Sequence, residues 1–323
     1  IRRLDCLLSF DAIAKSNAYV RPEVNETTTI EIKDGRHPVI EQQLPIDEEY
    51  VANDILLDNT DQQVIILTGP NMSGKSALLR QTALITLMAQ AGSFVPAESA
   101  SIGWVDKIFT RVGASDNIAL GESTFMVEML EAASILNNLS ERSLVILDEI
   151  GRGTSTYDGL SIAWAVAEYL HDLSGTGVKT LFATHYHELT DLVRTHQRVK
   201  NFNIAVKEWN DEIIFLRKLV DGGTNRSYGI QVARLAGIPR TVVKRAKKIL
   251  AGIESGAHPV GPSSETVASA GRPEKEAVQL SLFNSPENAV LTMLNRIDVT
   301  RLTPLEALNC LDRLCELAKG GSG

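Results

Sequence analysis

The sequence has 323 residues, of which 44% are hydrophobic and 22% are charged, and its net charge is −8 at pH 7. This composition is typical of a globular protein with one large domain or two to three small ones, and it argues against a chain whose whole surface binds nucleic acid, although a local basic patch is still allowed. No apolar run approaches the roughly 18 residues of a membrane span and no signal-peptide pattern opens the sequence, so no membrane contact is expected.

The first 36 residues predict a helix followed by a β-hairpin. Apolar residues recur at helical spacing within residues 1–20, as in the end of a helix that begins before this sequence. Residues 29–32 alternate between polar and apolar, and turn-forming residues follow at 33–36, which favours a hairpin. Because the sequence starts with Ile and ends in Gly-Ser-Gly, we expect a fragment, with residues 320–323 as an expression remnant or a native frayed tail.

Residues 69–76 follow the apolar run 64–68, which predicts a strand, a phosphate-binding loop and a helix over roughly 75–91. The loop glycines let backbone N–H groups turn toward phosphate oxygens, and the helix adds its positive end. Lys75 would reach the β- and γ-phosphates, and Ser76 would bind Mg²⁺. A chance glycine turn is the plainer alternative, which four fixed positions disfavour. The expected nucleotide-binding residues are Gly69, Pro70, Asn71, Met72, Ser73, Gly74, Lys75 and Ser76.

Apolar strands alternate with helices over the following 150 or so residues, which predicts an α/β fold with a mixed, mostly parallel sheet. The expected strands are 108–112, 144–147 and 179–183, and a hairpin pairs 204–209 with 212–219. The expected helices run from Ser123 to about Leu139, over 159–172 and over 187–194.

Two of these strands end in residues suited to phosphate chemistry. Asp148 would hold Mg²⁺ through water, and Glu149 would orient and activate the attacking water. His185, at the end of the next strand, would sense the γ-phosphate or help to position water. Taken alone, the two acids could equally be solvated strand ends, and a lone histidine there is more often structural. The phosphate loop earlier in the chain makes the catalytic interpretation of the acids the stronger one.

The pattern changes at residue 227. Residues 231–236 and 240–253 predict two helices around a Gly-Ile-Pro turn, which form a basic helix-turn-helix. Residues 255–278 are rich in Gly, Pro, Ser, Ala and Glu, as in a flexible linker. Residues 284–319 predict a small helical domain with a capping box at Thr303–Glu306. Because so small a piece cannot stabilise itself, we expect it to bind a partner, most simply a copy of itself.

The phosphate loop and the two strand ends resemble those of ABC-type ATPases, and further segments resemble the signature segments of the MutS family of DNA mismatch-repair ATPases. The resemblance covers essentially the whole chain and is closest to the C-terminal portion of bacterial members. The segments that carry it are 68–72, 109–113, 121–129, 148–159 and 183–185. It implies an ABC-type P-loop ATPase domain that binds and hydrolyses ATP with Mg²⁺ and releases ADP.

The resemblance also implies a division of the chain and further site residues. In the family, Ser123 reaches the γ-phosphate held by the other subunit, the 148–159 segment couples the two sites, Asn71 reads the γ-phosphate, and Tyr50 stacks on adenine. From the residues alone, Ser123 is a plain helix cap and Tyr50 is ordinary packing. The implied parts are the end of a lever helix (1–25), the ATPase domain (26–225), a helix-turn-helix dimerisation element (226–254), a linker (255–283), an all-α oligomerisation domain (284–319) and the tail (320–323).

Several partners follow from the resemblance. A homodimer is expected, with tetramers through 284–319, together with a MutL-type matchmaker, and mismatched DNA would be bound by N-terminal domains that this sequence lacks. Residues Gln279, Leu280, Leu282 and Phe283 resemble a peptide that docks on the bacterial sliding clamp, although they could instead begin the core of the small helical domain. The basic helices 231–253 could bind DNA, be a solvated face or contact the other subunit, and the family favours the last.

Two departures and three rival functions remain. Ser73 stands where many relatives have Gly, and Ala77 where many have Thr. The change at Ala77 removes one possible hydroxyl contact with the α-phosphate, which could weaken nucleotide affinity slightly. The rival functions are another ABC-type ATPase, a paralogous branch acting in recombination or ribosome rescue, and a non-catalytic module that senses nucleotide and assembles.

The three cysteines have no zinc or redox spacing, so a reducing bacterial cytoplasm is expected, with the protein associated with the nucleoid.

Overall fold

The computed structural model describes residues 2–45, 47–113, 123–209, 212–224 and 228–254. These residues belong to one compact unit, Ile1–Pro259. The predicted linker, the clamp-like peptide at 279–283, the helical domain at 284–319 and the tail all lie outside the described residues.

A six-stranded sheet forms the centre of the fold, in the order β10-β9-β4-β8-β7-β6. All neighbouring pairs are parallel except β9 with β10, which form the predicted antiparallel hairpin. The sheet is therefore mixed and mostly parallel, as the alternation of strands and helices predicted. Its strands are β4 (Val64–Thr68), β6 (Ile108–Val112), β7 (Leu144–Asp148), β8 (Lys179–Ala183), β9 (Val199–Trp209) and β10 (Glu212–Asp221).

A second sheet of four strands, in the order β1-β5-β2-β3, corrects the predicted hairpin. Its strands are β1 (Glu23–Asn25), β2 (Ile30–Gly35), β3 (Asn53–Leu57) and β5 (Ser99–Gly103). The residues 33–36 do not reverse the chain, because β2 continues to Gly35 and pairs on both edges with distant strands. A register shift between Ile32 and Gly35 takes up the turn-forming residues, with Asp34 at a φ of 43°.

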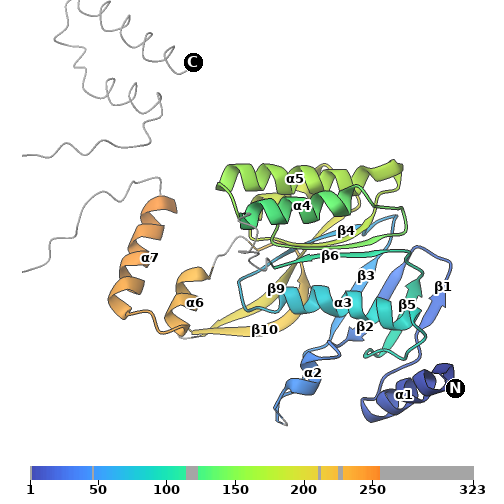
Figure 1. Cartoon of the computed structure of the whole chain (residues 1–323). Coiled ribbons are helices and arrows are strands. Elements are labelled where there is room, and N and C mark those ends of the chain that lie inside the picture. Colours follow the sequence, from blue (N-terminus) through green and yellow to red (C-terminus); the bar gives the residue numbers. More distant parts are fainter. Residues whose placement is uncertain (1, 46, 114–122, 210–211, 225–227, 255–323) are drawn as a thin grey trace, which may run out of the picture. The chain divides into compact units, whose positions relative to one another are not determined.

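Three helices cover the central sheet. Helix α3 (Lys75–Gln90) lies between the two sheets, and α4 (Thr124–Leu136) and α5 (Thr156–Asp172) cover the opposite face of the six-stranded sheet (Figure 1). Side chains on alternate positions of β4 fill two separate cores, because both faces of this parallel strand are buried. Helix α5 begins three residues before the predicted 159, because the Ser155 hydroxyl accepts a hydrogen bond from the Asp158 N–H and caps it.

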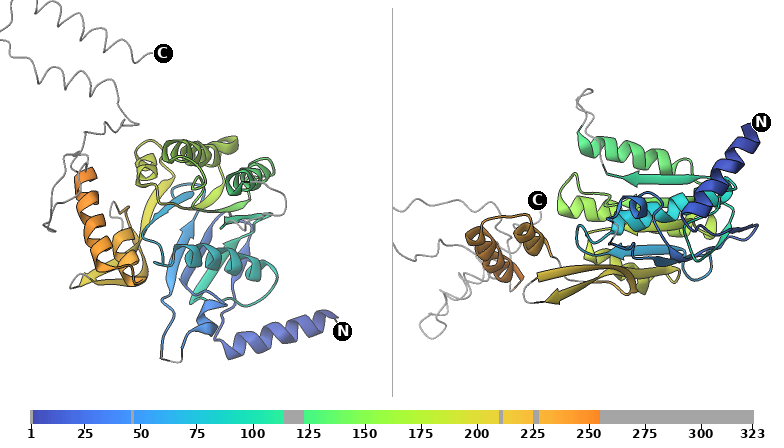
Figure 2. Two further views of the ribbon diagram at one scale, coloured as in Figure 1. Left: turned by 60° about the vertical axis from the view of Figure 1, so that its left-hand side comes forward. Right: turned by 90° about the horizontal axis from the view of Figure 1, so that it is seen from below.

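The remaining helices lie at the periphery (Figure 2). Helix α1 (Arg2–Ser16) has Leu4, Leu7 and Leu8 exposed. Helices α6 (Gly229–Leu235) and α7 (Arg240–Glu254) form the predicted helical pair beside the β9–β10 hairpin. Helix α2 (Ile40–Gln43) and the 3-10 helices η2 (Leu173–Gly175) and η3 (His187–Arg194) are short. Within the part of the chain that the structure describes, no helix is both long and apolar enough to cross a membrane.

Candidate nucleotide-binding site

The loop between β4 and α3 has the backbone that its glycines predict. Gly69 has a φ of 139° and Gly74 a φ of 108°, conformations that side chains other than glycine rarely adopt. Met72 is left-handed as well, with a φ of 67°, and 73% of its surface is exposed. Gly74 is the N-cap of α3, so the start of that helix faces the loop. A loop wound in this way presents backbone N–H groups on its inner side, which suits an anion.

Lys75, the first residue of α3, is only 5% exposed. Its Nζ donates hydrogen bonds to the carbonyl oxygens of Gly69 (2.5 Å) and Pro70 (3.1 Å). Burial lowers the pKa of Lys75, and the carboxylates of Glu149 and Asp148 oppose this shift because they favour the ammonium form. The loop therefore places a buried ammonium group beside two acids, whose negative charges favour its protonated form.

Glu149 directly follows β7 and is held in an unusual backbone conformation. Its φ is 60°, a left-handed value that costs a non-glycine residue on the order of 1–3 kcal/mol. The N–H of Glu149 donates to the Ala183 carbonyl at 2.9 Å, which ties this turn to the end of β8. Its carboxylate lies 2.6 Å from Nη1 of Arg152 and 3.9 Å from Nζ of Lys75. The strained turn thus directs the carboxylate toward the phosphate loop.

A pocket of about 510 Å³ brings together Ser76, Asp148 and Glu149. Oδ1 of Asp148 is buried there and has no hydrogen-bond partner among the described residues. A buried carboxylate oxygen without a partner is costly, whereas a hydroxyl and a carboxylate are oxygen ligands that suit Mg²⁺. The pocket residues fit a magnesium ion, and the assignment of Ser76 and Asp148 as its ligands stays a prediction.

A second pocket, of about 290 Å³, lies on the other side of the loop and is lined by Tyr50, Met72, Gly74 and Ala77 among others. Burial raises the pKa of Tyr50 to about 12, and its hydroxyl donates to Oε1 of Gln81 at 2.9 Å. The phenol is therefore neutral and fixed at one end. Its aromatic ring beside mostly apolar neighbours can accommodate a flat heterocycle.

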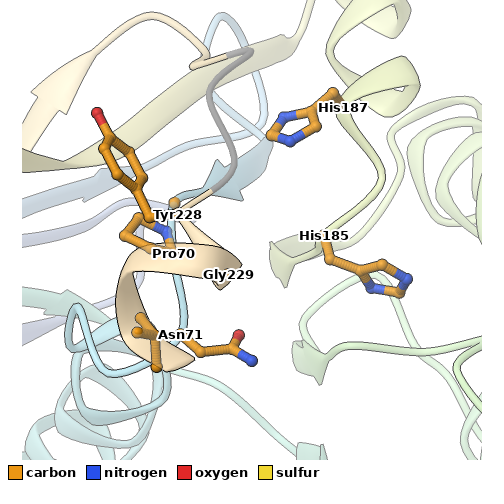
Figure 3. A pocket seen from close by; sticks show the side chains of 8 residues that line it. Pro70, Asn71, His185, His187, Tyr228 and Gly229 are labelled. Atoms are coloured by element: carbon orange, nitrogen blue, oxygen red, sulfur yellow. The ribbon is translucent and has the colours of Figure 1, made fainter. Parts of the chain in front are cut away.

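A third pocket, of about 280 Å³, separates the loop from α6 and is lined by Asn71, His185, His187 and Tyr228 among others. Figure 3 shows Asn71 on one side of this pocket and the two histidines on the other. Burial lowers the pKa of His185 to about 4, with further lowering from the positive charges of Arg152 and Lys75. His185 is therefore neutral at pH 7, and its Nδ1 has no hydrogen-bond partner among the described residues.

Ser123 is the N-cap of α4, and its Oγ accepts a hydrogen bond from the N–H of Met126 at 3.2 Å. This confirms the helix start that the sequence predicted. The residue is exposed, while residues 114–122, directly before it, lie outside the described part of the chain. A contact with a second subunit stays a prediction.

The structure adds residues to which the sequence assigned no role. Arg152 pairs with Glu149, and Arg111 and Glu128 line the same pocket as Asp148. Arg111 and Glu128 both fall in segments that carry the family resemblance, but a charged residue in a sequence does not reveal that it is buried. His187 could have been suspected from its spacing, two residues after His185.

Comparison with known proteins supports the resemblance. Residues 65–254 match the family model of MutS domain V. The chain is similar to the DNA mismatch repair protein MutS of Bacteroides fragilis (57% identical, covering 99% of this chain and 37% of the relative). It is also similar to that of Desulfosudis oleivorans (61% identical, covering 98% of this chain and 35% of the relative). The chain thus spans little more than a third of the length of these relatives.

Proposed function

The chain belongs to the MutS domain V family, the ATPase domain of DNA mismatch-repair proteins, and we propose that it is the ATP-driven switch of such a protein. The observation that carries this proposal is the convergence of Lys75, Ser76, Asp148 and Glu149 on one side of the phosphate loop. In finer terms, we assign residues 26–225 to an ABC-type ATPase domain and residues 226–254 to a dimerisation element.

The residues of the loop would bind the phosphates of ATP. Backbone N–H groups of Gly69 and residues 71–74 would surround the phosphate oxygens, while Lys75 would leave the carbonyls of Gly69 and Pro70 for the β- and γ-phosphates. Ser76 and Asp148 would hold Mg²⁺, which supplies charge neutralisation when it is bound. Oδ1 of Asp148, which has no hydrogen-bond partner within the part of the chain that the structure describes, supports this assignment.

Glu149 would act as the general base for the attacking water. Its carboxylate is 80% covered and faces Lys75, so it is shielded from bulk water yet close to the phosphate loop. His185 would act as a neutral hydrogen-bonding group near the γ-phosphate, because its low pKa keeps it uncharged. Asn71, which faces the same pocket, would report whether the γ-phosphate is present.

The remaining site residues would bind the base and join two copies. Tyr50 would stack on adenine in the pocket beside Met72 and Ala77. Ser123, exposed at the start of a helix of 13 residues, would contact the γ-phosphate held by a second copy. Each site would then be completed by the other subunit. Residues 284–319 would add further self-association, up to a tetramer.

The whole protein would act on mismatched DNA through domains that precede this portion in its relatives. Nucleotide state would switch its grip on DNA and its recruitment of a MutL-type matchmaker, in the bacterial cytoplasm at the nucleoid. The peptide Gln279–Phe283 would bind the sliding clamp. A binding measurement with purified clamp tests this last point: the double variant Leu282→Ala, Phe283→Ala should bind much more weakly, and undiminished affinity would refute the assignment.

Steady-state ATP hydrolysis by the purified chain tests the proposed function. Turnover should require Mg²⁺ and be abolished in Glu149→Ala, which should still bind nucleotide because the phosphate loop is untouched. Arg194→Ala, which removes an exposed cation that pairs with Asp191, serves as the control. Nucleotide binding without any turnover in the wild type would favour the rival non-catalytic sensing module. Retained turnover in Glu149→Ala would refute the role of Glu149.

A further inference from the structure

A buried carboxylate in α4 holds the turn that follows Glu149. Glu128 is only 4% exposed, and its Oε1 accepts a hydrogen bond from the backbone N–H of Gly151. Its Oε2 lies 3.4 Å from Nη2 of Arg111 on β6, a side chain that is equally buried. Burying two charges is costly even when they are paired, so such a pair is weak evidence for stability. Its place beside the strained turn indicates a role in orientation.

Gly151 is fixed from several directions. While Glu128 accepts from its N–H, the hydroxyl of Tyr186 donates to its carbonyl oxygen at 3.0 Å. Gly151 has a φ of 90°, and a Cβ at this residue would lie 2.6 Å from the carbonyl oxygen of Gly159. Both peptide groups of residue 151 are therefore engaged, and the turn has little freedom to relax.

The strain at Glu149 makes these anchors necessary. A left-handed non-glycine residue keeps its conformation only when its surroundings hold it there. The anchors are the Ala183 carbonyl before the turn, and Glu128 with Tyr186 after it. Of these, Glu128 is the one charged group, and a hydrogen bond to a charged acceptor is stronger than one between neutral groups.

We propose that Glu128 is a positioning residue for hydrolysis, which sets the direction of the Glu149 carboxylate through the N–H of Gly151. This inference rests on the proposed function, because it presupposes that Glu149 activates water. Helix α4 would then carry both the residue that contacts the second copy and the residue that orients Glu149. The helix begins at the Ser123 cap and carries Glu128 less than two turns later, so a second copy that contacts Ser123 would act on the Glu149 turn of this copy through one rigid element.

The variant Glu128→Ala tests the inference, with Glu131→Ala as its matched control. Glu131 lies on the same helix, and its Oε2 is 3.0 Å from Nε of Arg111 in a contact poorly aligned for a hydrogen bond. It touches Arg111 but not Gly151. We expect kcat to fall on the order of 10- to 100-fold in Glu128→Ala, as for a misplaced catalytic group, with nucleotide affinity unchanged. Glu131→Ala should stay close to wild type.

Amide hydrogen exchange gives a readout that does not depend on turnover. In Glu128→Ala, peptides that cover 149–153 should lose protection while those of β7 and β8 keep it. Glu128→Gln, which retains an oxygen for Gly151, should keep more protection and more activity, and it replaces the alanine variant if that one does not fold. Equal losses in the Glu128 and Glu131 variants, or wild-type kcat and protection in Glu128→Ala, would overturn the inference. Retained turnover in Glu149→Ala would instead count against the proposed function.

Discussion

Nζ of Lys75 lies 3.9 Å from Oε1 of Glu149, although the two residues come from separate strand ends. Lys75 follows β4 and Glu149 follows β7, and only β8 separates these strands in the sheet. Because the carboxyl ends of parallel strands meet at one edge of a sheet, residues distant in sequence converge there. The same edge carries His185 at the end of β8. This arrangement makes one ammonium group serve both the phosphate loop and the proposed base.

Replacing Lys75 by alanine should weaken nucleotide binding. The change removes charged hydrogen bonds worth about 1.5–3 kcal/mol, or roughly 10- to 150-fold in the dissociation constant, and it removes a positive charge from beside Glu149 and the phosphates. Titration with a fluorescent ATP analogue measures the loss. Lys200→Ala, which removes a lysine that pairs with Asp61 on the surface, is the matched control. If the Lys75 and Lys200 variants bound nucleotide with equal affinity, Lys75 would not be a nucleotide-binding residue.

His185 should remain neutral well below pH 7. Its pKa in the folded chain is about 4, against roughly 6.5 in an unfolded chain. Between these values the unfolded chain binds more protons, so this histidine contributes stability that is present above about pH 6.5 and lost as the pH falls toward 4. An NMR titration of the His185 ring should show no protonation between pH 7.5 and 5.5. In the chain unfolded by urea the same signal should titrate near pH 6.5. A midpoint near pH 6.5 in the folded protein would show that His185 is not buried as the structure has it.

Gly159→Ala should destabilise the fold around the Glu149 turn. A Cβ at this residue would lie 2.2 Å from both the Gly151 carbonyl oxygen and the Tyr186 hydroxyl. Overpacking of this kind costs about 1–3 kcal/mol, which urea denaturation can measure. Gly229→Ala is the control, because nothing lies within 4 Å of its added carbon and it should gain about 0.4–1 kcal/mol. Equal stabilities of the two variants would show that the 151–159 contact is not close.

The residues at the strand ends could be predicted from the sequence, whereas the buried residues that hold them in place could not. The runs 64–68, 144–147 and 179–183 are short, apolar and followed by polar residues, which located Lys75, Asp148, Glu149 and His185 without any knowledge of packing. The path of β2 could not be predicted, because it depends on pairing with β3 and β5, far away in the sequence. The buried pair of Arg111 and Glu128 was equally hidden, since charged residues are usually exposed.

Charge reversal on α7 should separate subunit contact from DNA binding. Lys244 and Arg245 lie on the basic helix pair, and Lys244 lines its groove of about 790 Å³. The double variant Lys244→Glu, Arg245→Glu should reduce self-association, measured by light scattering with MgATP, and leave DNA affinity unchanged. Lys15→Glu with Arg194→Glu, two exposed cations elsewhere, controls for net charge. A large loss of DNA affinity confined to the α7 variant would assign this surface to DNA.

Mixing two inactive variants tests the shared site most directly. Ser123→Asp keeps a good helix cap but places a negative charge where the partner's γ-phosphate would bind, and Lys75→Ala binds nucleotide so weakly that its own site stays largely empty at sub-saturating ATP. In a mixed dimer, the site of the Ser123→Asp chain keeps its own Lys75 and receives Ser123 from the Lys75→Ala chain. ATP hydrolysis by the mixture should therefore exceed the sum of the two separate variants. Activity equal to that sum, at concentrations where wild-type activity rises with dimer formation, would contradict a site completed by a second copy.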